Sequence, residues 1–146
     1  MLASVALVLT IASSPAPGAS LPAPVDVTLP HPREATRLKR QWGVDVIGVR
    51  ETAAGYMLEF RYSVIDPKKA APLFVRQTKP VLIDEATGAQ LQVPTPPKTG
   101  ALRNSNPPLA RHTYWMFFAN PGRSLKRGQR VSVVIGDFRA EHVVIR

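Results

Sequence analysis

The chain has 146 residues, 45% of them hydrophobic, and a formal net charge of +9 from 19 Lys and Arg against 10 Asp and Glu. This length suits one domain that is held together by its own hydrophobic core. The absence of cysteine excludes disulfides, zinc–thiolate sites, iron–sulfur clusters and cysteine nucleophiles, and the surplus of positive charge favours anionic partners.

Residues 1–20 have the order of a secretory signal peptide. The apolar run MLASVALVLTIA precedes a region rich in small residues and proline, as in exported proteins. No Lys or Arg precedes the run, so the alternative is a disordered Ala/Pro-rich tail. The run is too short to cross a bilayer, which takes about 20 apolar residues. This pattern predicts a periplasmic or secreted protein with no transmembrane span.

Residues 21–41 are interpreted as a connector that is first proline-rich and then basic. The segment PREATRLKRQW starts with Pro32 and places Ala35, Leu38 and Trp42 on one side, which allows a short helix or turn. Its positive charges make the densest basic stretch of the chain: Arg33, Arg37, Lys39 and Arg40. They are candidates for an electrostatic contact arm, and the alternative is a solvated connector that leads into the first strand.

From residue 42 to residue 146 the sequence alternates strand patterns with turns. The clearest strand is GYMLEFRYSVIDP, 55–67, which places Tyr56, Leu58, Phe60, Tyr62 and Val64 on one buried face. Further strands are expected at 43–50, 79–84, 89–93, 111–119, 130–138 and 140–146. We expect 55–67 to pair as a hairpin with the strand before it, 79–84 to pair with 89–93, and 111–119, apolar on both faces, to be central. Seven short strands without a long helix predict an all-β domain, an immunoglobulin or fibronectin III-like β-sandwich.

Two connections between these strands have their own signals. Asp66 can cap a single helical turn that begins at Pro67. Residues 94–110 contain five prolines and one glycine, so we expect an irregular surface loop there. Long loops of this kind often carry function.

Several longer stretches carry a resemblance to known proteins. LKRGQRVSVVIGDF is similar to the penultimate hairpin of extracellular immunoglobulin-like domains. GYMLEFRYSVIDPKKAAPLF, KPVLIDEATGAQLQVP and YWMFFANPG together resemble a group of small exported bacterial proteins of unassigned function with an immunoglobulin-like β-sandwich. The resemblance covers 42–146 and implies export and the fold class, with no catalytic residue to carry over.

Motifs of enzyme chemistry are absent. The sequence has no nucleophile elbow, phosphate loop, dinucleotide fingerprint or HExxH motif, so we expect neither an enzyme nor a cofactor. Asp84 with Glu85, and Asp137 with Glu141, lie at predicted strand ends, where turn-forming roles suffice. We therefore expect no pair of catalytic carboxylates.

A copper site is a further hypothesis, which rests on one histidine and two methionines. His112 and Met116 are expected on one strand face, with Met57 across from them, and these are soft ligands that copper accepts. Blue-copper geometry needs a cysteine, which the chain lacks. A face of alternating His, Tyr, Met and Phe is more often core with a histidine at its rim.

These observations predict an exported, non-catalytic binding or accessory domain of the bacterial cell envelope. Its partner would be an anionic envelope component or another envelope protein, and not nucleic acid, because most aromatic residues are expected in the core rather than on a stacking platform. The alternatives are a structural domain that pairs with another protein through a sheet edge and a periplasmic copper-binding protein. The residues expected to contact an anion are Arg33, Arg37, Lys39, Arg40, Lys126, Arg127 and Arg130.

Overall fold

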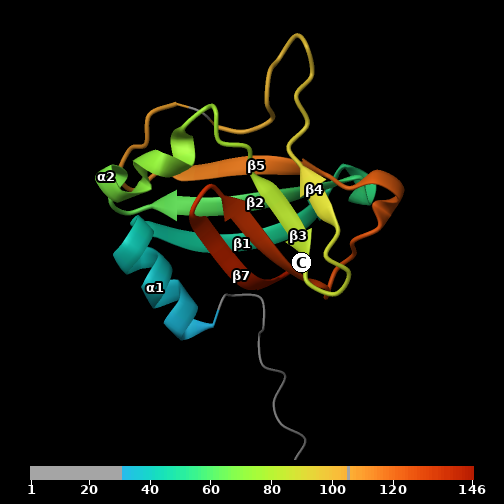
Figure 1. The fold of residues 1–146 in the computed structure, drawn as a ribbon, viewed down its shortest axis with the longest axis horizontal. Helices are drawn as coiled ribbons and strands as arrows, with labels where there is room; N and C mark the ends of the chain where they lie inside the picture. The colour runs from blue at the N-terminus through green and yellow to red at the C-terminus, as the bar shows by residue number, and fades with distance from the viewer. Residues whose placement is uncertain (1–30, 105) are drawn as a thin grey trace, which may run out of the picture.

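The computed structural model describes residues 31–104 and 106–146 (Figure 1). The predicted signal-like segment 1–20, and residues 21–30 of the predicted connector, lie outside the described residues. In the part of the chain that is described, no helix is both long enough and apolar enough to cross a membrane.

Seven strands in the described ranges form two antiparallel sheets. The first sheet has the order β1-β2-β5, with β1 at Val44–Thr52, β2 at Met57–Val64 and β5 at Thr113–Ala119. The second has the order β4-β3-β6-β7, with β3 at Val81–Asp84, β4 at Gln90–Gln92, β6 at Arg130–Ile135 and β7 at Phe138–Val144. The structure is mostly β, as predicted, although it also contains an 11-residue helix, and the hairpins β1–β2 and β3–β4 are confirmed.

The two sheets lie face to face, with their strands at an angle to one another (Figure 1). The chain first passes between them after β2, through helix α2 at Pro67–Ala70 and the 3-10 turn η2 at Ala71–Phe74. Asp66 caps this turn as predicted, because its side chain accepts from the backbone N–H groups of Lys68 and Lys69 at 3.0 and 3.4 Å. The long segment 93–112 then returns the chain to the first sheet, and the 3-10 turn η3 at Pro121–Arg123 follows β5.

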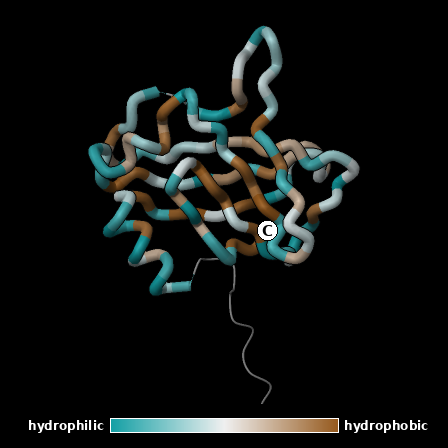
Figure 2. The backbone as a smooth tube through the Cα atoms, in the orientation of Figure 1, coloured by the Kyte–Doolittle hydropathy of each residue, from teal (hydrophilic) through white to brown (hydrophobic). Residues whose placement is uncertain are grey.

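The core fills the space between the sheets. Phe60 and Tyr62 of β2 are fully buried and stack with their ring centroids 5.4 Å apart, and Figure 2 shows hydrophobic residues along the strands. The expected buried face of β2 is confirmed from Leu58 to Val64 but is wrong at Tyr56, which is 57% exposed. The reason is that β2 starts only at Met57, so Tyr56 belongs to the turn that follows the 3-10 turn η1 at Ala53–Gly55.

The position of β5 also differs from the prediction. β5 is an edge strand of the first sheet, and β2 is the central one. Its inner face is buried as expected, but Trp115 and Phe117 lie on the outer face, half-buried and 5.0 Å apart. The outer edge of β5 bonds to the long loop, because Phe117 N donates to Leu102 O at 2.9 Å and Asn104 N donates to Trp115 O at 3.1 Å.

The basic segment ahead of β1 is the helix α1, Pro32–Trp42, and it belongs to the folded domain. α1 contacts β1 and β7, Leu38 on it is fully buried, and Trp42 packs edge-on against Phe138 at 5.8 Å. Gly43 ends the helix in the left-handed conformation, where a Cβ would come within 2.7 Å of Asp66. The alternative of a solvated connector up to residue 41 is therefore wrong for α1, because the apolar side of this helix packs against β1 and β7.

The docking of α1 should be measurable in solution. Leu38→Ala is expected to lower the free energy of unfolding by about 2 to 5 kcal/mol, as truncation of a buried leucine usually does. Urea denaturation followed by tryptophan fluorescence measures this loss. Arg33→Ala, an exposed change on the same helix, is the control and should stay within about 0.5 kcal/mol of the wild type. A Leu38→Ala loss no larger than that of the control would mean that α1 does not pack on the sheets in solution.

Candidate functional site

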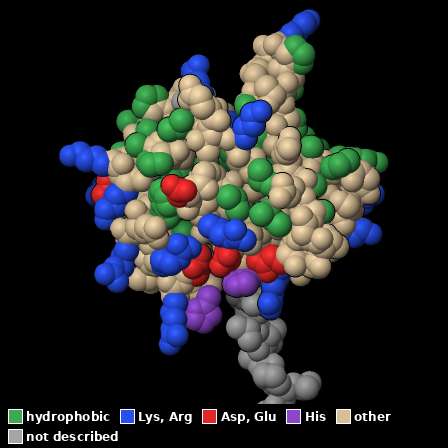
Figure 3. Space-filling view, in the orientation of Figure 1, with side chains coloured by type: hydrophobic (Ala, Val, Ile, Leu, Met, Phe, Trp, Pro, Cys, Tyr) green, Lys and Arg blue, Asp and Glu red, His purple; other side chains and the backbone are tan. Residues whose placement is uncertain are grey.

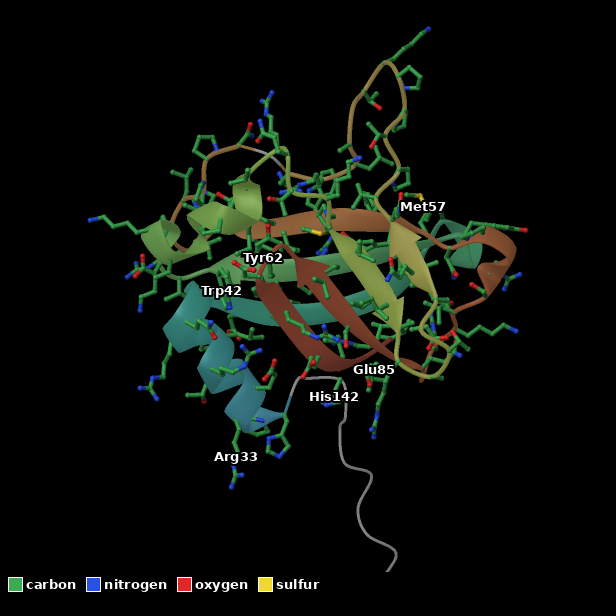
Figure 4. All side chains as sticks on the ribbon, viewed as in Figure 1. Arg33, Trp42, Met57, Tyr62, Glu85 and His142 are labelled. Carbon is green, nitrogen blue, oxygen red and sulfur yellow. The ribbon has the colours of Figure 1, made fainter. Side chains whose placement is uncertain are left out.

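The first predicted basic group lies on α1, and α2 adds two cations to it. Lys69 Nζ donates to Arg40 O at 3.0 Å, which holds the two helices side by side. Figure 3 shows Lys and Arg side chains gathered at this end of the molecule, and in Figure 4 Arg33 points away from the domain. We define the α1–α2 surface by its six exposed cations: Arg33, Arg37, Lys39, Arg40, Lys68 and Lys69.

Only some of these cations are neutralised by neighbours. Arg37 Nε donates to Glu34 Oε2 at 2.9 Å, and this hydrogen bond holds the pKa of Glu34 below its usual value and raises the pKa of Arg37. Lys39 Nζ lies 3.3 Å from Asp45 Oδ2. Among the described residues, Arg33, Arg40, Lys68 and Lys69 form no ion pair. Lys69 is held by its hydrogen bond to Arg40 O, so the side chains of Arg33, Arg40 and Lys68 are the most available to a partner.

The second predicted basic group lies at the other end of β1. The turn that contains Lys126 and Arg127 leads into β6, which starts at Arg130, and Arg127 N donates to Glu51 Oε1 at 3.0 Å near the end of β1. Lys39 pairs with Asp45 near the start of the same strand. Six residues of extended strand separate these two acidic positions by about 20 Å. The structure therefore does not bring the two basic groups together.

One cation that the sequence analysis missed is Arg103, in the 94–110 loop. It is only 8% exposed, and its guanidinium donates to Thr78 O at 3.0 Å and to Leu73 O. Burial lowers the pKa of Arg103, and no carboxylate among the described residues pairs with it. A single arginine in a proline-rich loop carries no sequence signal of this kind, because arginine is ordinarily an exposed residue.

The residues of the copper hypothesis are separated in the structure. Met116 is fully buried in the core, whereas Met57 lies on the opposite face of the sheet, since its neighbour Leu58 is fully buried on the inner face. His112 is exposed and lies before β5, with its Nδ1 3.0 Å from Ala110 O. The expectation of one shared face is therefore wrong. In 31–104 and 106–146, no three His, Cys, Asp or Glu residues form a group that could hold a metal.

The predicted acidic pairs have other neighbours. Asp84 accepts from Ala86 N at 3.1 Å and from Thr87 Oγ1 at 2.6 Å, which closes the turn after β3. Glu85 accepts from Ser132 Oγ at 2.9 Å and from His142 N at 2.7 Å, and its other oxygen is 3.0 Å from His142 Nδ1 (Figure 4). Partial burial alone would raise the pKa of Glu85, but the hydrogen bonds from His142 and Ser132 bring it below its usual value.

The fourth carboxylate of these pairs has a basic partner. Glu141 accepts from Arg139 Nε at 2.7 Å. Asp84 thus closes a turn, Glu85 bonds to Ser132 and His142, and Glu141 forms a surface ion pair. Asp137 is exposed in the turn between β6 and β7.

Most sheet edges in the described part are occupied. Arg146 bonds along the edge of β1, since its N donates to Val49 O at 3.0 Å and its O accepts from Glu51 N at 3.1 Å. At β7, Arg37 of α1 donates to Arg139 O at 2.7 Å. The long loop covers part of β5, and β4 is only three residues long. This arrangement leaves little edge for a partner strand.

Neither the family models nor the curated proteins nor the solved structures give a match to this chain.

Proposed function

We propose that this protein is an exported, non-catalytic binding domain of the bacterial cell envelope, and that its α1–α2 surface attaches to an anionic envelope component. The observation that carries the proposal is the contact of Lys69 Nζ with Arg40 O, because it joins the cations of two helices into one exposed patch. Export is supported by the signal-like order of residues 1–20.

The fold proposed for this role is an immunoglobulin or fibronectin III-like β-sandwich. It is supported by two antiparallel sheets of three and four strands and by connections that pass from one sheet to the other. Domains of this kind present turns and short helices at their ends, away from the core. The α1–α2 surface is such an end.

A fixed patch of cations favours an extended anionic partner over a single small ligand. Each Lys or Arg near an anionic membrane contributes about 1 kcal/mol, so Arg33, Arg40 and Lys68 together can hold the domain reversibly. Exposed charges are screened beyond about 8 Å at physiological salt, so the attachment should weaken as salt rises. Pairing through a sheet edge is the weaker candidate, because α1, the long loop and Arg146 occupy most of the edges.

The proposal predicts that charges on α1 and α2 matter more than charges elsewhere. The variant Arg33→Gln/Arg40→Gln/Lys68→Gln removes three cations of the patch that form no ion pair in the described ranges, and it keeps Lys69, which joins α2 to α1. If each contributes about 1 kcal/mol, binding to anionic vesicles at low salt should fall on the order of a hundredfold. Co-sedimentation with vesicles of increasing anionic lipid content, at low and physiological salt, measures the effect, and an immobilised acidic polysaccharide serves as a second surface.

The matched control is Lys98→Gln/Arg111→Gln/Arg123→Gln, which also removes three exposed charges, none of them among the predicted anion contacts. We expect this control to bind both surfaces nearly as well as the wild type. Equal losses in the two variants would show that only the net charge matters. Failure of the wild type to bind either surface at low salt would also reject the proposal.

A further inference from the structure

We propose that a cleft at the base of the 94–110 loop binds the oxyanion group, a carboxylate or a phosphate, of a small ligand. The cleft has a volume of about 300 Å³. It lies between the segment that leads into β3, the end of β4 and the returning part of the loop. The side chains on its walls that matter for binding are Arg76, Thr78, Lys79, Gln92, Thr95 and Arg103.

Arg103 is the first observation behind this proposal. More than nine-tenths of this residue is buried. Within 31–104 and 106–146, however, its Nε has no hydrogen-bond partner and no carboxylate balances its charge. Two backbone carbonyls, Leu73 O and Thr78 O, accept from the other guanidinium nitrogens. A buried cation is unfavourable unless an anion compensates it, and a guanidinium is well suited to bind carboxylate or phosphate.

The second observation is the charge of the cleft walls. Arg76 and Lys79 contribute two more cations, both exposed and both without an ion pair in the described ranges. No Asp or Glu of the described part of the chain lines the cleft. A second hollow, of about 380 Å³, also has Arg76 and Arg103 on its walls, together with residues 99–101 of the loop. Positive potential is thus concentrated where three cations converge, as it is in clefts that attract anionic ligands.

The volume of the cleft and its uncharged side chains limit the kind of ligand that it can bind. A volume of about 300 Å³ is at the lower end for small-molecule sites, so the cleft suits a small anion or one charged unit of a larger molecule. Thr78, Thr95 and Gln92 can donate further hydrogen bonds. Among the residues that the structure describes, no aromatic side chain lines the cleft, and this argues against stacking of a nucleobase.

The cleft goes beyond the proposed function, because it shares no residue with the α1–α2 surface. Attachment to vesicles tests α1 and α2, whereas uptake of a small anion tests the cleft. The variant Arg33→Gln/Arg40→Gln/Lys68→Gln should therefore keep its affinity for small anions within about twofold. The two proposals can fail separately.

The test is an NMR titration of the ¹⁵N-labelled full chain with inorganic phosphate and, separately, with acetate, at an ionic strength held constant with sodium chloride. We expect saturable shifts that concentrate in residues 76–81, 92–95 and 101–103. The anion that saturates the shifts at the lower concentration identifies the preferred group. Arg76→Gln/Lys79→Gln should weaken binding at least tenfold, and both changes are on the exposed wall, away from the core.

The matched control is Lys98→Gln/Arg111→Gln, which removes two exposed charges near the same loop but outside the cleft. Its affinity should stay within about twofold of the wild type. Shifts that spread alike over all basic residues, shifts that do not saturate with either anion, or unchanged binding by Arg76→Gln/Lys79→Gln would each overturn the proposal. Arg103 would then only clamp the loop to the segment before β3.

Discussion

Replacing Phe60 with alanine is expected to lower the free energy of unfolding by about 3 to 5 kcal/mol, the usual cost of truncating a buried aromatic side chain. Phe60 is fully buried on the central strand β2, and its ring stacks on that of Tyr62. Alanine would leave a cavity between the sheets that neighbouring side chains cannot fill without leaving their rotamers. Urea denaturation at neutral pH measures the change.

Tyr56→Ala is the control for Phe60→Ala. Tyr56 is one position outside β2 and 57% exposed, and Arg123 lies over its ring at 5.9 Å. Its truncation should cost less than about 1 kcal/mol. If Phe60→Ala cost no more than this, the inner face of β2 would be assigned wrongly.

Replacing Asn120 with alanine is expected to lower the free energy of unfolding by about 3 to 5 kcal/mol, although the removed group is polar. Asn120 is fully buried. Its Nδ2 donates to Gly55 O and Leu125 O, both at 2.8 Å, and its Oδ1 accepts from Leu125 N at 3.0 Å and from Ser124 Oγ at 3.1 Å. Alanine would leave several polar groups without partners, and each buried one costs about 1 to 3 kcal/mol.

Asn104→Ala is the matched control for Asn120→Ala. The side chain of Asn104 accepts one hydrogen bond, from Trp115 N at 3.1 Å, so its loss should cost about 1 kcal/mol. Urea denaturation of both variants gives the comparison. Equal and small losses would show that water replaces the bonds of Asn120 and that this side chain does not hold the turn after β1 against the connection from β5 to β6.

The sequence predicted the strands well because strand patterns are local. Alternation in β2 and the glycine turns of the hairpins depend on residues close together in the chain, and the structure places β1–β2 and β3–β4 accordingly. The prediction was wrong for β5, which is apolar on both faces for most of its length but lies at a sheet edge. Its edge contacts come from Leu102 and Asn104, more than ten residues away, and no local pattern encodes such a partner.

The candidate site was predicted only in part, for the same reason. The basic stretch of α1 is visible in the sequence because its four cations are close neighbours. The contribution of α2 is not visible in the sequence, because Lys69 and Arg40 are in contact although they are 29 positions apart in the chain. Likewise, Arg103 donates hydrogen bonds to the carbonyls of Thr78 and Leu73, which are 25 and 30 positions away in the chain.

The local sequence was enough to predict the approximate positions of the strands, the paired turns, the helical turn capped by Asp66 and the excess of positive charge. The order of the strands, the docking of α1 through Leu38, the separation of the two basic groups and the burial of Arg103 depend on long-range packing. Period and capping follow from hydrogen bonds and sterics within a few residues. Strand order and the grouping of charges follow from which apolar faces pack together, and that packing joins residues far apart in the chain.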